Sequence, residues 1–419
     1  MEIRAIGCEP LQLKRVHMKD GHTIKVYRDT GGYASLKKAL TMSPAEIIEE
    51  VKASALRGRG GAGFPTGMKW SFVPKDSPKE KYVVCNADES EPGSFKDRYL
   101  MERDPHSMIE GMIIAAYALG SSTGYIYTRG EYKYLIDIMD VALAEAREAG
   151  MLGKNIFGSD FSCDIHTHTG AGAYICGEET ALLNSIEGYR GEPRNKPPFP
   201  TQLGLFAQPT VINNVETLIN IPSIVLDGGD AFASVGSGQS TGTKLFCLSG
   251  HVMYPGVYEA NFGVTLRQLL DLAGGISGTG RLKGVLIGGA AGAFVGQRDL
   301  EMPLTFEGAR AAGTSLGSAV VMPFDDTVDL QQILLRIAAF FRDESCGQCV
   351  PCRVGTVRQE ELLHRLAQKR PINSRATELV VLKEVGQAMR DASICGLGQT
   401  ASSAIESAFA RFNLFSEKA

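Results

Sequence analysis

The chain has 419 residues, of which 44% are hydrophobic and 21% are charged, and it carries a formal net charge of −4 at pH 7. That length predicts two or three domains with an ample core, and the weak negative charge excludes the electrostatic footprint of a protein that binds nucleic acid or anionic lipid. The nine cysteines, in a chain that begins without the apolar core of a signal peptide, indicate thiolate chemistry more than disulfides. We expect a soluble, cytoplasmic protein that meets a membrane only through partners.

The first informative stretch is a basic, glycine-dense loop at residues 56–70. Residues 58–63 match the G-x-G-x-x-G pattern of dinucleotide-binding folds, but that motif needs a strand before it and a helix that starts within it. Upstream, Ser43-Pro44-Ala45-Glu46 predicts a capping box, and apolar residues then recur at helical spacing up to Ala55. A helix therefore precedes the glycines, and we reject the ordinary fingerprint. A custom phosphate-binding loop is the favoured interpretation, with a structural turn as the open alternative.

Two further segments carry clustered carboxylates. Residues 81–86 predict a buried strand that leads directly into the acidic loop 87–98, which is where α/β folds place ligand-binding residues. A solvated acidic loop stays open as the alternative. A second glycine-rich turn, 170–177, leads into Glu178 and Glu179 and then into a helix. Acidic residues in a first helical turn suit the helix dipole alone, and they also suit recognition of ribose hydroxyls.

The spacing of apolar residues divides the chain into three parts. A glycine- and serine-rich stretch at 227–243 indicates a domain boundary. The segment beyond it predicts a small α+β unit, in which the glycine run 288–292 forms a turn rather than a nucleotide loop. From Asp329 the spacing becomes helical and predicts a small four-helix bundle. The expected domains are 1–240, 241–327 and 328–419. Expected helices lie at 106–119, 134–149, 180–186, 265–273, from 329, and near 354–369, 376–391 and 399–413; expected strands lie at 81–86, 125–129, 163–168, 244–248, 257–259, 284–287 and 318–322.

Two groups of residues have the types that bind metals. Three cysteines follow a C-x2-C-x2-C spacing at 346–352, and Cys395 stands between the last two expected helices. Three thiolates plus one remote thiolate is a 4Fe-4S pattern, whereas zinc normally takes two pairs of ligands. His166 and His168 are interpreted as surface polar residues of a strand, with a metal site as the weaker alternative. The other cysteines are expected to be small buried hydrophobes: Cys8, Cys85, Cys163, Cys176 and Cys247.

A one-electron cluster beside a phosphate-cofactor site indicates a redox enzyme with a flavin between them.

Taken together, these motifs resemble a known family. The matching runs are 57–70, 85–98, 170–182, 196–200, 213–217, 344–353 and 394–398. They are similar to the F-type subunit of NADH-quinone oxidoreductase (respiratory complex I), the 51-kDa FMN- and NADH-binding subunit family, and to related diaphorase subunits of NAD-dependent hydrogenases and formate dehydrogenases. The resemblance implies a multidomain α/β plus α fold. Its parts would be an N-terminal Rossmann-like α/β domain that binds FMN, a small β-grasp (SLBB) domain, and a C-terminal four-helix bundle that holds the cluster.

The resemblance also implies roles for individual residues. It places the FMN phosphate and ribityl chain near Arg59, Gly60, Gly61 and Lys69, and completes the cofactor pocket with Asn86, Asp88, Glu89, Tyr174, Gly177, Glu178, Asn213, Asn214 and Thr217. NADH would stack over the flavin, with Phe64, Phe72 and Phe199 on the adenine side, Glu91 by the nicotinamide as the catalytic residue, and Glu179 by the adenosine ribose. The 4Fe-4S ligands would be Cys346, Cys349, Cys352 and Cys395.

The implied function is the electron-input step of bacterial complex I, in which NADH reduces FMN and single electrons pass through the 4Fe-4S cluster towards quinone. The implied partners are a thioredoxin-like 2Fe-2S subunit (E type) and a multi-cluster subunit (G type), at the cytoplasmic side of the inner membrane. The alternatives are a diaphorase subunit of a hydrogenase or formate dehydrogenase, and a non-catalytic iron–sulfur relay or scaffold. Residues 288–313 match the family poorly, and the extra iron–sulfur domain fused to some hydrogenase-type relatives is missing, which favours complex I.

Overall fold

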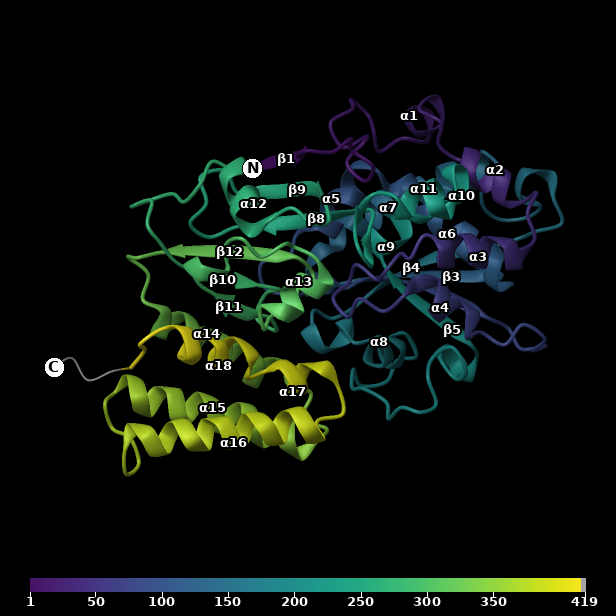
Figure 1. The fold of residues 1–419 in the computed structure, drawn as a ribbon. Coiled ribbons are helices and arrows are strands. Elements are labelled where there is room, and N and C mark those ends of the chain that lie inside the picture. Colours follow the sequence, from purple (N-terminus) through teal and green to yellow (C-terminus); the bar gives the residue numbers. More distant parts are fainter. Residues whose placement is uncertain (416–419) are drawn as a thin grey trace.

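A parallel sheet forms the centre of the first part of the chain in the computed structural model, which describes residues 1–415 (Figure 1). The strand order is β4-β3-β2-β5, and every neighbouring pair is parallel. The carboxyl ends of parallel strands meet at one edge, where α/β folds place ligands. The strands are β2 (Tyr82–Ala87), β3 (Thr123–Thr128), β4 (Asp164–Thr169) and β5 (Thr210–Asn214).

Helices surround this sheet, and α6 (Pro105–Leu119) is buried along almost its whole length, as expected for a helix that is apolar on all sides. The sequence-predicted capping box is confirmed, because Glu46 N–H donates to Ser43 Oγ at 3.3 Å and Ser43 N–H donates to Glu46 Oε2 at 2.7 Å. The other helices are α1 (Ile24–Asp29), α2 (Ala34–Ala39), α3 (Pro44–Ala53), α4 (Thr66–Ser71), α5 (Lys96–Arg103), α7 (Lys133–Glu148), α8 (Glu179–Ile186), α9 (Val215–Ile219), α10 (Ile221–Asp227) and α11 (Gly229–Ala233).

A six-stranded mixed sheet makes the middle part, in the order β1-β9-β8-β12-β10-β11. One of its two edge strands is β1 (Glu2–Ala5), which pairs parallel with β9 (Gly256–Asn261); no pattern within residues 1–30 predicted this strand. The remaining strands are β8 (Thr243–Leu248), β10 (Leu282–Ile287), β11 (Ala293–Val295) and β12 (Val320–Asp325), with helices α12 (Leu266–Leu272) and α13 (Phe306–Ala311) and the short pair β6 (Gly236–Ser237) and β7 (Ser240–Thr241). The expected domain boundaries after residues 240 and 327 stay a prediction.

The C-terminal part is a helical bundle that packs on the edge of the middle sheet (Figure 1). Its helices are α14 (Leu330–Glu344), α15 (Val350–Ala367), α16 (Arg375–Ala392), α17 (Gly396–Thr400) and α18 (Ser403–Arg411). The last expected helix, 399–413, is thus divided into α17 and α18. Apolar side chains of the bundle and of β10–β12 share one buried cluster, so the bundle is fixed to the sheet by a common core. No helix among residues 1–415 is long and apolar enough to span a bilayer.

Candidate functional site

The glycine loop lies between α3 and α4, as the sequence predicted, and folds back on itself. The Gly58 N–H donates to the Phe64 carbonyl at 2.9 Å, which closes the loop. Gly61 has a φ of +136°, a value that favours glycine. At Gly60 an added Cβ would stand only 2.9 Å from the Asn214 Cβ. The loop therefore presents backbone without side chains next to the end of β5, an arrangement suited to a bound phosphate.

Arg59 lies in this loop, but the structure places its guanidinium on protein carbonyls. It donates to the carbonyls of Arg57, Thr241 and Thr243 at 2.9, 2.7 and 3.2 Å, and burial lowers its pKa to about 10. The Arg59 backbone N–H donates to Thr217 Oγ1 at 2.9 Å. Arg59 therefore fastens the glycine loop to the first strands of the middle part, and its side-chain charge is not directed at a ligand.

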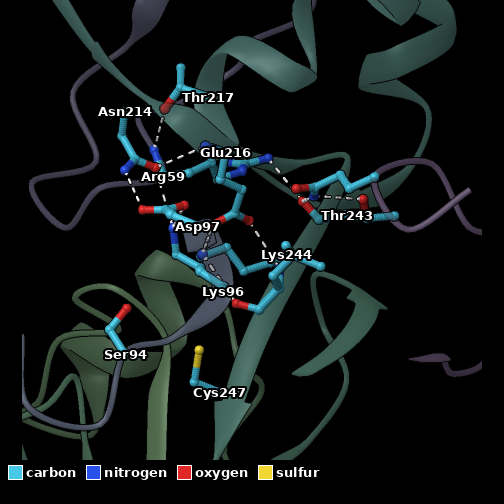
Figure 2. Close-up of polar contacts among 12 residues, drawn as sticks. Arg59, Ser94, Lys96, Asp97, Asn214, Glu216, Thr217, Thr243, Lys244 and Cys247 are labelled. Carbon is cyan, nitrogen blue, oxygen red and sulfur yellow. Dashed lines mark hydrogen bonds and ion pairs between the residues drawn. The ribbon is translucent and has the colours of Figure 1, made fainter. Parts of the chain in front are cut away.

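Close to Arg59, a buried network of charges joins the first part to the middle sheet (Figure 2). Lys96 Nζ lies 2.7 Å from Asp97 Oδ1 and 3.0 Å from Glu216 Oε2, and Lys244 Nζ lies 2.5 Å from that Glu216 oxygen. Burial opposes the charged form of Glu216, but Lys244, Lys96 and Arg59 outweigh it and hold its pKa at about 2. Removing one partner would leave a buried charge without compensation, which is strongly destabilising.

The three asparagines expected in the cofactor pocket have protein partners and hold the loops together. Their bonds run from Asn214 to Asp97 Oδ2 at 2.7 Å, from Asn86 to the Gly177 carbonyl at 2.8 Å, and from Trp70 Nε1 to Asn213 Oδ1 at 2.9 Å. The Asn86 bond ties the carboxyl end of β2 to the turn before α8, so the acidic segments that follow these two points lie close to each other. These bonds hold the loops of the site in place, and the expected contacts of the three asparagines with FMN stay a prediction.

The first acidic group consists of Asp88, Glu89 and Glu91 in the loop after β2. Glu89 accepts two backbone N–H bonds from the start of α5 at 2.9 and 3.1 Å. Glu91 accepts the Tyr174 O–H at 2.8 Å and the Ala291 N–H at 3.1 Å. Asp88 Oδ1 is buried and has no hydrogen-bond partner within the described chain. Burial raises the pKa of each of the three carboxyls to about 7.

The second acidic group consists of Glu178 and Glu179 at the start of α8. Glu178 caps this helix by accepting the N–H groups of its first turn at 2.8 and 3.0 Å. Lys196 Nζ lies 2.9 Å from Glu178 Oε1 and 2.8 Å from Glu179 Oε1, and Lys69 Nζ lies 3.6 Å from Glu179 Oε2. Burial acts to raise the pKa of Glu179, but Lys69 and Lys196 outweigh it and keep the pKa below its usual value.

The three aromatic side chains that the sequence placed on the adenine side of the site are exposed. Phe64, Phe72 and Phe199 are 42%, 53% and 52% exposed. The rings of Phe64 and Phe72 lie 6.3 Å apart between centroids, and they flank α4, which carries Lys69. Phe199 comes from the separate segment that carries Lys196. Exposed rings of this kind suit the stacking of a planar base.

The four expected cluster ligands lie in two connections of the helical bundle, with Cys346 between α14 and α15 and Cys352 in the first turn of α15. Cys349 directly precedes α15 and Cys395 directly precedes α17, so the positive ends of two helix dipoles face this region. Cys352 Sγ lies 3.3 Å from Ser345 Oγ. A Cβ at Gly398, in α17, would stand 2.8 Å from the Cys352 Cβ, so the segment of Cys395 packs directly against α15.

Burial raises the pKa of Cys352 and of Cys395 to about 11. Within residues 1–415, no three His, Cys, Asp or Glu side chains are close enough to hold a single metal ion. A 4Fe-4S cluster is ligated at its corners by four separate thiolates, so its ligands need not converge on one point. His166 is exposed, and the ring of His168 stacks on Tyr127 at 5.5 Å between centroids. Of the other cysteines, Cys85, Cys163, Cys176 and Cys247 are buried and Cys8 is half-buried.

Tyr174 lies between the first acidic group and the cysteines. Its O–H donates to Glu91, and its backbone N–H donates to Glu344 Oε2 at 2.9 Å. Its ring packs edge-on against Phe340 of α14 at 5.0 Å between centroids. Burial, together with the negative charge of Glu91, raises the pKa of Tyr174 well above its usual value, so the phenol stays protonated. Tyr174 therefore connects the two candidate cofactor sites through its side chain and backbone.

Sequence reasoning missed the charged residues that stabilise the site. Lys196 has its acidic partners 17 and 18 positions away, and Lys244 has its partner 28 positions away; no local spacing predicts such pairs. Glu216 appeared in the sequence only within the run 213–217 that resembles the family, and no role was predicted for it. The buried residues missed in the sequence are Lys96, Asp97, Glu216 and Lys244.

The residues present fit the two groups that the sequence implied. Bare backbone at Gly60 and Gly61, in the loop that leads to α4 with its half-buried Lys69, suits the phosphate of a flavin mononucleotide. The unpartnered, buried Asp88 Oδ1 provides an acceptor with no protein donor among the described residues. Four thiols beside two helix N-termini supply the ligand set of an iron–sulfur cluster.

Comparison with known proteins adds independent findings. Residues 51–223 match the model of the Nuo51 FMN-binding domain, residues 244–331 the SLBB domain, and residues 332–418 the NADH-ubiquinone oxidoreductase-F iron-sulfur binding region. The chain is 48% identical over 406 residues to the second F-type subunit of NADH-quinone oxidoreductase of Rhizobium meliloti, covering 96% of both chains. It is 44% identical over 382 residues to NADP-reducing hydrogenase subunit HndC of Solidesulfovibrio fructosivorans, covering 91% of this chain and 77% of that one. Among solved structures, a chain of an NAD+-reducing NiFe-hydrogenase matches with a TM-score of 0.84 and 37% identity, over 94% of this chain and 66% of that chain.

Proposed function

The chain belongs to the family of the F-type subunit of NADH-quinone oxidoreductase, and from that premise we propose that it is the electron-input subunit of a respiratory complex I. It oxidises NADH at a bound FMN and passes electrons through a 4Fe-4S cluster to other subunits of the complex and on to quinone. The observation that carries this proposal is the single connected site in which Asn86 joins the two acidic groups and Tyr174 joins them to the cysteine segment.

The chemistry at the site comes from the bound groups, because a flavin accepts a hydride and releases electrons singly to an iron–sulfur cluster. The contribution of the protein is orientation and electrostatics. The glycine loop at Gly60 and Gly61, with Lys69, binds the FMN phosphate, and the three asparagines keep the surrounding loops in place. Cys346, Cys349, Cys352 and Cys395 hold the cluster.

The NADH would lie between the two acidic groups. Phe64, Phe72 and Phe199 stack the adenine, and Glu179 accepts hydrogen bonds from the adenosine ribose. The two lysines keep Glu179 ionised, so this carboxylate repels the extra phosphate of NADPH. Glu91 lies beside the nicotinamide, which gains positive charge when the hydride leaves, and a nearby carboxylate stabilises that charge.

Membership in this family implies that the chain works with other subunits of a complex. The finer assignment we propose is a thioredoxin-like 2Fe-2S subunit of the E type and a multi-cluster subunit of the G type. We also place the chain at the cytoplasmic side of the inner membrane, reached through those partners. Co-purification of a tagged chain from membranes, with both subunits present in stoichiometric amount, is the expected result; a chain recovered alone in the soluble fraction would contradict it.

A diaphorase subunit of a hydrogenase is the second candidate, and two observations favour it. The similar protein of Solidesulfovibrio fructosivorans is named as an NADP-reducing hydrogenase subunit, and the similar solved structure is an NAD+-reducing hydrogenase. Genes beside the one for this chain separate the two candidates. Genes for membrane subunits of complex I support our proposal, and genes for hydrogenase subunits would overturn it in favour of the diaphorase.

The proposed activity is tested on the chain purified without oxygen. We expect about one flavin per chain and NADH-dependent reduction of ferricyanide. A preparation that holds iron but no flavin and has no such activity would support a non-catalytic electron relay instead.

The ligand assignment is tested by Cys395→Ala. We expect loss of the 4Fe-4S electron paramagnetic resonance signal with the FMN retained, because the residues assigned to FMN lie in the first part of the chain and the substituted thiol lies in the helical bundle. The matched control is Cys8→Ala, which changes a half-buried cysteine far from the bundle in sequence. An intact signal in Cys395→Ala would place the fourth ligand elsewhere.

A further inference from the structure

The turn at residues 288–292 between β10 and β11 has no role in the proposed function, yet it reaches the first acidic group. The Ala291 N–H donates to Glu91 Oε1 at 3.1 Å. The other carboxylate oxygen, Oε2, accepts the Tyr174 O–H at 2.8 Å. Both oxygens of Glu91 are therefore held, one from the middle sheet and one from the segment before α8.

Gly289 fixes how closely the turn approaches this carboxylate. Its φ is +80°, and an added Cβ would overlap the Glu91 side chain. Only a residue without a side chain lets the backbone come so near. The N–H groups of both Ala290 and Ala291 act on Glu91 and partly offset the burial that raises its pKa. The turn thus directs two backbone N–H groups at one carboxylate.

The rest of the acidic loop also rests on the middle sheet. Gly93 has a φ of +91°, and a Cβ there would stand 2.7 Å from Val320 Cγ1 in β12. The Phe95 N–H donates to Cys247 Sγ in β8 at 3.3 Å. The contact at Gly289 is therefore one of several by which the sheet supports the loop, and it is the one that touches the functional carboxylate.

We propose that the 288–292 turn is a positioning element of the NADH site, which holds the Glu91 carboxylate in place for the nicotinamide. This inference rests on the proposed function, because it gives the middle part of the chain a task in NADH binding. The turn acts through Glu91: backbone N–H groups and the bare Gly289 set the position of the carboxylate, and Tyr174 holds its other oxygen.

The test substitutes Gly289→Ala in the full chain loaded with its cofactors. The matched control is Gly275→Ala, because Gly275 lies in the same part of the chain with a φ of +79° and nothing within 4 Å of an added Cβ. Both changes place a Cβ on a residue with nearly the same positive φ, and only at Gly289 would that Cβ meet the carboxylate. The readouts are the dissociation constant of NAD+ by calorimetry, KM and kcat for NADH separately, and the contents of FMN and iron.

We expect Gly289→Ala to lower kcat/KM for NADH at about pH 8 by about fivefold, the loss expected when the Glu91 carboxylate no longer serves the nicotinamide, and to weaken NAD+ binding, with flavin and iron retained. Gly275→Ala should leave all readouts within about twofold. In a Glu91→Gln background, Gly289→Ala should have less than about a twofold further effect, because the interaction that it disturbs is already lost. An equal loss in both backgrounds would show that the turn acts only through packing and would overturn the proposal.

A second variant covers the case in which Gly289→Ala does not retain flavin. Glu91→Asp shortens the side chain by one methylene and removes the overlap, so the double variant should regain flavin and NAD+ binding. A double variant that still lacks flavin overturns the proposal. Failure of the proposed function itself is distinguishable, because it appears in the wild-type chain as absence of flavin or of NADH oxidation.

Discussion

The two acidic groups of the candidate site contain the same kinds of residue in different surroundings. Asp88, Glu89 and Glu91 lie in the loop after β2, and burial raises the pKa of all three to about 7. Glu179 is half-buried, and Lys69 and Lys196 keep its pKa below the usual value. Near neutral pH Glu179 therefore carries a fixed negative charge, and the charge of the first group changes with pH.

This difference shows that the neighbours of a carboxylate decide which part of a substrate it can serve. A fixed charge suits discrimination between a ribose hydroxyl and a phosphate, because that choice must not vary with pH. A carboxyl with a pKa near 7 suits the nicotinamide side, where charge appears during the reaction. Three substitutions test this difference, and each of them changes a residue at only one of the two acidic groups.

The largest effect is expected from Glu179→Gln. Loss of the fixed charge, with Lys69 and Lys196 left in place, should raise kcat/KM for NADPH relative to NADH by about tenfold, or ~1.4 kcal/mol. Steady-state kinetics with both nucleotides measure this ratio. Glu192→Gln, a change at a half-buried carboxylate 3.9 Å from Arg190, is the control. A nucleotide ratio that stays the same would remove the ribose role from Glu179.

Glu91→Gln should produce a smaller effect that depends on pH. The pKa of about 7 means that the carboxyl is mostly ionised at about pH 8 and mostly protonated at about pH 6. The substitution should therefore lower kcat/KM for NADH by roughly fivefold at the higher pH and by less than about twofold at the lower pH. The measurement is the pH profile of kcat/KM for the variant and the wild type. Equal losses at both pH values would show that the charge of Glu91 does not matter.

The smallest effect is expected from Lys196→Met. This substitution removes the lysine shared by Glu178 and Glu179, but Lys69 remains 3.6 Å from Glu179 and keeps it ionised at neutral pH. Because Lys196 is partly exposed, its loss should raise KM for NADH by only about two- to threefold, with little change in kcat. Isothermal titration with NAD+ provides a second readout. A loss larger than that of Glu179→Gln would mean that Lys196 contacts the nucleotide itself.

Features that depend on residues close together in the chain were predictable from the sequence. The capping box at Ser43–Glu46, the helix before the glycine loop and the cysteine spacing at 346–352 depend on residues a few positions apart. Family resemblance then indicated which loops gather at the site. The match of residues 51–223 and 332–418 to the family's two cofactor-binding regions agrees with that inference.

The directions of side chains were not predictable, because they depend on contacts between distant segments. Arg59 looked like a phosphate ligand in its basic loop, but the carbonyls of residues 241 and 243 bind its guanidinium. No role was predicted for Glu216, but Lys96 and Lys244 make it the centre of a buried network. In the same way, the turn at 288–292 was correctly expected to be a turn, and nothing in its sequence indicated that it meets Glu91.

The central claim is that one chain joins a flavin site that accepts electrons from NADH to a 4Fe-4S cluster. The most direct test is the absorption spectrum of the anaerobic, purified chain during titration with NADH, with flavin and iron quantified in the same sample. We predict about one FMN and about four irons per chain, with bleaching of the flavin by NADH and reduction of the cluster after it. A chain with both groups in which NADH bleaches neither, or one that holds iron without flavin, would contradict the claim.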